Sequence, residues 1–141
     1  MHPEKLLSRH PLNNGLVLEL WDHSRPVAGD RWHPALEARL AVPVEAANLP
    51  PALAPAEAEV RAALGPDLIF SQQDERNFIA APEVPRIKPE MASRALALAH
   101  RYFGHPDFPR RLIAKKYAEY LHRRSWQASQ SRTEAHPGSD D

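Results

Sequence analysis

The sequence predicts an α+β fold: a three-stranded antiparallel sheet with two C-terminal helices packed on one face and a short helix between strands two and three. Two observations lead to this prediction. Residues 16–44 contain two runs in which apolar and polar residues alternate, and the last third of the chain shows apolar residues at spacings of three and four. Alternation with period two is typical of half-buried antiparallel strands, and the longer period is typical of amphipathic helices.

The two alternating runs form the predicted hairpin at the centre of the sheet. Directly opposed residues of an antiparallel pair share a face, so Leu18 or Leu20 should oppose Leu36, Ala38 or another even-numbered residue. We favour Leu36 opposite Leu18, which leaves residues 25–29 as the connection, because Ala38 opposite Leu18 sets two glutamates against each other.

The same alternation assigns the core to the even-numbered face of both strands. The residues on the odd-numbered face include glutamates, arginine and histidines, which favour solvent. The predicted core consists of Leu18, Leu20, Leu36 and Leu40 packed against Leu96, Leu98, Phe103, Tyr117 and Leu121.

Residues outside the hairpin give weaker signals. Residues 1–14 are predicted to be a flexible arm that ends at the Asn14-Gly15 turn signal. A short helix is expected over residues 56–64, because acidic residues fill its first turn and Gly65 follows its end. We expect residues 67–80 to form one long third strand, and a hairpin turning at residues 73–74 is the alternative.

Two helices follow an extended linker over residues 81–89. The first is predicted over residues 89–103, with Gly104 in a left-handed capping position. The second is predicted over residues 108–124, and the polar segment 125–141 is predicted to be a disordered tail. The organised part is therefore one predicted domain over residues 15–124.

Composition narrows the possible functions. Lysine and arginine total 18, as do aspartate and glutamate, so no overall positive field attracts nucleic acid or a membrane surface. The chain has no cysteine, which excludes disulfides and zinc–thiolate sites and fits a reducing cytoplasm. No apolar run approaches the roughly 20 residues that span a bilayer.

The tip of the predicted hairpin is one candidate site. Asp22 falls on the core face near the end of its strand, where a carboxylate needs a partner. Asp22, Arg25 and Asp30 could together form a corner that binds an anion or transfers protons. We favour a structural interpretation, in which these side chains fix their own loop, because aspartates often cap turns in this way.

Histidines provide a second candidate. His23 and His33 lie on the polar face and could hold a divalent metal together with Glu19 or Glu37. No HxH, HxxxH or HExxH spacing supports a metal site, so we predict neither a metal nor another cofactor. Nucleophile and phosphate-loop motifs are also missing from the sequence, and we therefore lean against an enzyme.

The last predicted helix carries the third candidate. Between residues 108 and 126, six lysines and arginines stand against one glutamate, so the local charge is six minus one, or +5. This basic surface could contact an acidic protein or the phosphates of a nucleic acid, or it could simply be solvated. Its candidate contact residues are Arg111, Lys115, Lys116, Arg123 and Trp126.

Two segments resemble a family of short uncharacterised bacterial proteins. The segments are LELWDHSRPVAGDRW, followed by an alternating strand that ends in Val-Pro-Val, and the later DFPRRLIAKKY. The resemblance covers about residues 12–124 and implies that residues 67–80 are strand-like, although this stretch is more polar than the family pattern. It implies no activity.

We expect a small, soluble, cytoplasmic bacterial protein that acts as a non-catalytic binding or accessory module through protein–protein contact. A nucleic-acid-associated protein is the first alternative, and an enzyme or small-anion binder at the hairpin tip is the second.

Overall fold

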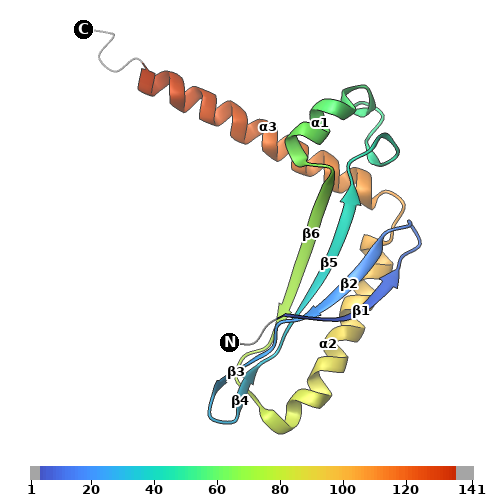
Figure 1. Cartoon of the computed structure of the whole chain (residues 1–141), viewed down its shortest axis with the longest axis vertical. Helices are drawn as coiled ribbons and strands as arrows, with labels where there is room; N and C mark the ends of the chain where they lie inside the picture. The colour runs from blue at the N-terminus through green and yellow to red at the C-terminus, as the bar shows by residue number, and fades with distance from the viewer. Residues whose placement is uncertain (1–3, 136–141) are drawn as a thin grey trace. The chain divides into compact units, whose positions relative to one another are not determined.

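The structure is a computed structural model that describes residues 4–135 of the chain (Figure 1). The described residues divide into two compact units. The first combines residues up to Val42 with Ile69–Phe108, and the second combines Pro43–Leu68 with the residues from Pro109 onward. The single domain over residues 15–124 stays a prediction.

The predicted α+β class with antiparallel sheets is confirmed, but the number of strands is not. Instead of one three-stranded sheet, the described residues form a four-stranded sheet of order β1-β2-β5-β6 and a three-stranded sheet of order β3-β4-β7. The strands are β1 (Lys5–Pro11), β2 (Val17–Asp22), β3 (Arg25–Ala28), β4 (Arg31–His33), β5 (Ala35–Pro43), β6 (Asp67–Glu75) and β7 (Ile79–Ala80).

The N-terminal residues do not form the predicted flexible arm. Lys5–Pro11 is strand β1, which pairs with β2 in an antiparallel register that opposes Arg9 to Glu19 and His10 to Leu18. Arg9 Nε also donates a hydrogen bond of 3.1 Å to Glu19. The strand has little alternation of its own, and its conformation comes from the partner strand beside it.

The register between β2 and β5 pairs Leu18 with an even-numbered residue, as expected, but this residue is neither the favoured Leu36 nor Ala38. Leu18 opposes Leu40, two residues beyond Ala38, and Glu19 opposes Arg39. The opposite charges of this pair stabilise the register, whereas the rejected alternative would have opposed two glutamates. The longer connection that results is not a loop, because it contains the second hairpin, β3 and β4.

The predicted core face is confirmed in the sheet. Leu18, Leu20, Leu36 and Leu40 are each at most 2% exposed. Helix α2 (Val84–Leu98) lies on this face, since its residues line one cavity together with Leu36 and Ala38. Of the predicted helical partners, Phe103 is buried, whereas Leu96, Leu98 and Tyr117 are half-buried and Leu121 is 41% exposed.

The stretch 67–80 is neither one long strand nor a hairpin. Strand β6 ends at Glu75, and β7 begins at Ile79 in the other sheet, where Ile79 opposes Trp32 of β4. Between them Phe78 adopts a left-handed φ of 52°, which is rare for a residue with a bulky side chain. The polar stretch before Phe78 therefore contains the point where the chain changes sheets.

The helices also differ from their predicted limits. The short helix is confirmed as α1 (Glu57–Leu64). Helix α2 begins at Val84 inside the predicted extended linker, because Pro85 suits the first turn of a helix and Pro89 is tolerated within it. Helix α3 (Phe108–Ala135) continues through residues 125–135, where we predicted disorder, and residues 136–141 lie outside the described part.

The turn between β1 and β2 contacts the segment that follows α2, and Gly104 lies at this contact. Asn14 Nδ2 donates hydrogen bonds to the carbonyls of Phe103 (2.8 Å) and His105 (3.0 Å), which confirms the turn and gives it a tertiary role. Gly104 has a φ of −90°, so the predicted left-handed cap is wrong. Glycine is needed there for another reason: a Cβ atom would lie 3.3 Å from both Leu12 Cβ and the carbonyl oxygen of Ala99.

Gly104→Ala should destabilise the protein by about 1–3 kcal/mol, the usual effect of overpacking a filled site. Urea unfolding measures this change. In a double-mutant cycle with Leu12→Gly, the combined loss should be smaller than the sum of the single losses, because glycine lacks the Cβ atom that the new methyl group would crowd. Strict additivity would show that contact with Leu12 is not the cause.

Candidate functional site

Asp22 is held by a loop N–H group, one of the partners expected for it, and by Lys88, which the sequence did not indicate. Its Oδ2 lies 2.7 Å from Lys88 Nζ of α2, and its Oδ1 accepts a 2.8 Å hydrogen bond from the backbone N–H of Ser24. The side chain is 14% exposed. Burial alone would raise the pKa of Asp22, but the hydrogen bonds from Lys88 and Ser24 outweigh it and lower the pKa below its ordinary value.

The other two residues of the predicted corner lie in the small sheet. Arg25 is an exposed residue of β3, and Asp30 lies in the β3–β4 turn, where its carboxylate is 3.8 Å from Arg31 Nε. Asp22, by contrast, ends β2 in the large sheet. This arrangement makes Asp22 a link between the large sheet and α2, whereas Arg25 and Asp30 belong to the small sheet and its turn.

Asp22→Asn should lower the melting temperature, because it removes the charge that pairs with Lys88. We expect a loss of about 1–3 kcal/mol, the usual value for a hydrogen bond to a charged group. Asp30→Asn is the matched control and should change stability little, since the Asp30 side chain is 72% exposed. A stabilised Asp22→Asn protein would contradict the structural role and favour a strained functional carboxylate.

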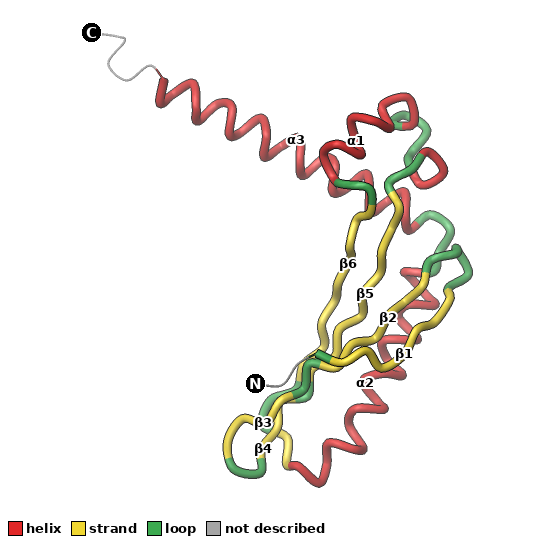
Figure 2. Tube along the Cα trace, viewed as in Figure 1, coloured by secondary structure: helices red, strands yellow, loops and turns green. Residues whose placement is uncertain are grey.

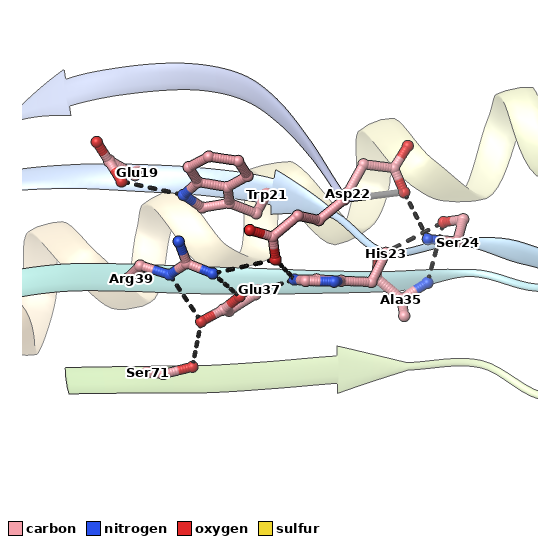
Figure 3. Close-up of polar contacts among 10 residues, drawn as sticks. Glu19, Trp21, Asp22, His23, Ser24, Ala35, Glu37, Arg39 and Ser71 are labelled. Atoms are coloured by element: carbon pink, nitrogen blue, oxygen red, sulfur yellow. Dashed lines mark hydrogen bonds and ion pairs between the residues drawn. The ribbon is translucent and has the colours of Figure 1, made fainter. Parts of the chain in front are cut away.

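A second polar cluster lies on the odd-numbered face of the large sheet, centred on the buried Glu37 (Figure 3). Arg39 donates to Glu37 from Nε (3.0 Å) and Nη2 (2.7 Å). His23 Nε2 lies 2.7 Å from the same carboxylate, and the hydroxyl of Ser71 donates to it at 2.6 Å. Glu37 therefore joins β5 to β6 and to the end of β2, with each carboxylate oxygen accepting more than one bond.

These contacts determine the charge of Glu37. The hydrogen bonds from Arg39 lower its pKa most, burial opposes them, and the bonds from Ser71 and His23 add to the lowering, so that the pKa is about 2. The same pairing raises the pKa of Arg39. A carboxylate with this pKa is a weak base at neutral pH, so the cluster is suited to holding strands together rather than to proton transfer.

The cluster continues across β2 through Trp21. The Arg39 guanidinium lies 4.5 Å from the centre of the Trp21 ring, a cation–π contact. Trp21 Nε1 donates to Glu19 at 3.0 Å, and this hydrogen bond is the main cause of a lowered pKa at Glu19. Because Glu19 also binds Arg9, polar contacts connect all four strands of the sheet.

The cluster also contains three residues with metal-binding atoms. One ligand atom each from Glu4, His23 and Glu37 lies within 4.8 Å of the others. However, Arg39 Nη2 lies 3.3 Å from Glu4 and 2.7 Å from Glu37, so a cation is already paired with both carboxylates. A divalent ion would have to displace this guanidinium, and the residues therefore fit a salt-bridge network better than a metal site. His33, the other predicted ligand, lies 3.5 Å from Glu75 instead.

The basic surface lies on α3, in the second unit. Arg111, Lys115 and Arg123 are exposed, and Lys116 is half-buried with its Nζ 3.5 Å from Glu119. Trp126 is 61% exposed. Arg123 and Trp126 also line a hollow on the helix surface together with His122 and Gln127.

Sequence reasoning missed most of the partners in these clusters, and Lys88 and Arg39 show the two reasons. Lys88 lies 66 positions from Asp22, and no local signal connects the two. Arg39 could have been found, because Glu37 and Arg39 are two apart on one strand and so share a face. No protein-family model matches the chain, no curated protein or solved structure matches it either, and the family resemblance stays a prediction.

Proposed function

We propose that this chain is a non-catalytic binding module that contacts an acidic protein partner through one face of α3, which runs from Lys115 into the distal half of the helix, residues 121–130. One observation carries the proposal: every residue of this segment is exposed although the segment is helical. Helices without packing are marginal in water, because most helical stability in proteins comes from tertiary contacts. A partner that covers this segment would supply those contacts.

The chemistry of the partner follows from the side chains on this helix. At 100° per residue, Lys115 and Arg123 fall within about 60° of Trp126 around the helix axis. Cationic residues and an exposed aromatic residue thus share one face. Tryptophan and arginine are the residues most enriched at binding hot spots. The complementary surface is a groove with an apolar pocket for Trp126 and carboxylates around it, the mode in which grooves bind helices.

A nucleic acid is the second candidate, because the arc shared by Trp126 and the cations would let the ring stack on a base while the cations contact phosphates. The chain as a whole is neutral, which argues against strong binding of this kind. If it occurs, about four phosphate contacts should give a slope near −3 to −4 for log affinity against log salt.

Fluorescence anisotropy with two labelled probes tests the proposal. One probe is a 16-residue peptide in which glutamates surround four leucines, and the other is an oligo-dT of the same length. At roughly 50 mM salt, where charges are screened least, the peptide should bind and the oligo-dT should not. If only the oligo-dT binds, the partner is a nucleic acid and not a protein. If neither probe binds, the proposal is contradicted.

Charge reversal of Lys115 and Lys116 to glutamate should weaken peptide binding about tenfold or more, through lost charge complementarity. Trp126→Ala should weaken it by a similar factor. The reversal should change stability by no more than about 1 kcal/mol, as at other surface sites. Arg86→Glu is the matched control, since Arg86 is an exposed cation on α2 in the other unit, and it should leave binding unchanged.

A further inference from the structure

The two edges of the four-stranded sheet are protected to different degrees. β1, at one edge, carries Lys5, an irregularity between Leu6 and Ser8, and Pro11 at its end. Lysine, bulges and proline are the features by which proteins block pairing at an edge strand. β6, at the other edge, has nine residues and contains no lysine, arginine or proline (Figure 2).

The direction of the backbone groups of β6 can be read from both of its ends. The Pro66 carbonyl accepts a hydrogen bond from Val44, and the Arg76 N–H donates to Pro34, so even-numbered positions point toward β5. Successive residues of a strand point their N–H and C=O groups to opposite sides. Residues 69, 71 and 73 therefore present both groups to the free edge, and Glu75 presents its N–H, since its carbonyl already accepts a 3.1 Å hydrogen bond from Arg76 Nη1.

A cavity of about 180 Å³ lies beside this edge, between β6 and α2. The apolar part of its lining includes Leu36, Ala95 and Phe103, and the exposed Gln72 and Gln73 form part of its wall, so it reaches the surface next to the free edge. Cavities of about 150 Å³ can hold benzene. The space therefore suits one aliphatic or aromatic side chain.

The charge beside the cavity selects the partner. The edge segment Ile69–Glu75 carries two carboxylates and no cation. Asp74 is paired with Arg76, whereas Glu75 is 49% exposed and has His33 at 3.5 Å. A cationic side chain on an added strand would approach Glu75 favourably.

We propose that β6 binds an extended segment of another protein as a fifth strand. The segment places one apolar side chain in the cavity between β6 and α2 and directs a lysine or arginine toward Glu75. Main-chain hydrogen bonds to the odd-numbered residues supply affinity, and the cavity and the carboxylate supply specificity, as in other cases of strand addition. This surface is separate from the α3 segment proposed above and does not depend on it.

The probe for this proposal is the peptide acetyl-Lys-Val-Lys-Leu-Lys-Val-Lys-amide, followed by NMR on the ¹⁵N-labelled full chain. Shifts should concentrate at the amides of residues 69–75, and exchange of the odd-numbered amides with solvent should slow. The control peptide has the same side chains but N-methyl groups on alternate amides. Because it keeps the charge and loses the donors, it should bind about tenfold more weakly or worse. Equal binding of the two peptides would contradict strand addition.

Two variants locate the site. Gln73→Pro removes an N–H that faces the free edge, so the fold should persist while peptide affinity falls about tenfold or more. Ala95→Leu fills the cavity from the surface of α2 and tests the site even if the proline variant fails to fold. Unchanged affinity in Ala95→Leu would overturn the proposal. Concentration-dependent dimerisation of the parent that Gln73→Pro abolishes would also overturn it, because a second copy would then be the occupant.

Discussion

Leu40→Ala should reduce the free energy of unfolding by about 2–5 kcal/mol, the range for large-to-small changes in protein cores. Leu40 is 1% exposed and lies opposite Leu18, which is fully buried, so the deletion leaves a cavity that rigid neighbours on both strands can fill only in part. Urea unfolding followed by circular dichroism measures the loss.

Val17→Ala is the matched control for this prediction. Val17 lies at the start of β2 on the odd-numbered face and is 44% exposed, so its truncation should cost less than about 1 kcal/mol. Similar losses at Leu40 and Val17 would show that the even-numbered face is not the core and would contradict the register.

The second large effect is a loss of folding stability at low pH. Glu37 has a pKa of about 2 in the folded protein against an ordinary value of 4.5. Since the folded state holds the proton less tightly, the carboxylate stabilises the fold fully above pH 4.5, and this contribution disappears as the pH falls from 4.5 toward 2. At 1.36 kcal/mol per pKa unit, the contribution is on the order of 3 kcal/mol.

Glu37→Gln tests this assignment. The variant should lose about 3 kcal/mol at pH 7, because the half-buried Arg39 loses its closest charged partner and keeps only the 3.3 Å contact with Glu4. It should also be less sensitive to acid than the parent between pH 4.5 and 2. Denaturant unfolding at several pH values measures both effects, and parallel pH profiles for the two proteins would assign the acid sensitivity to other carboxylates.

Local patterns predicted the parts of the fold that depend on them. The alternation over residues 16–44 identified the buried face correctly, because each side of a strand must match its surroundings. It did not determine the register, since the connection contains a second hairpin and the decisive pair, Glu19 with Arg39, becomes visible only when the strands are aligned. β1 was missed for a similar reason: its sequence carries no strand pattern, and β2 imposes the conformation.

Proline was the main source of error in the helices. Pro85 and Pro89 indicated an extended linker, but Pro85 lies in the first turn of α2, where a missing N–H costs no hydrogen bond, and the helix continues through Pro89. Contacts distant in sequence could not be predicted at all. Asp22 was correctly identified as a carboxylate in need of a partner, and that partner, Lys88, comes from a helix that the sequence pattern did not extend so far toward the N-terminus.

The distal half of α3 is the central functional assignment, and mapping the binding site of the acidic 16-residue peptide by NMR tests it most directly. Amide shifts on titration should concentrate between Lys115 and Gln127, with the indole N–H of Trp126 among the largest. Residues near Asp22 and Glu37 should not shift, because their carboxylates are already paired within the fold. Shifts centred on either of those clusters, or no shifts on α3, would contradict the assignment.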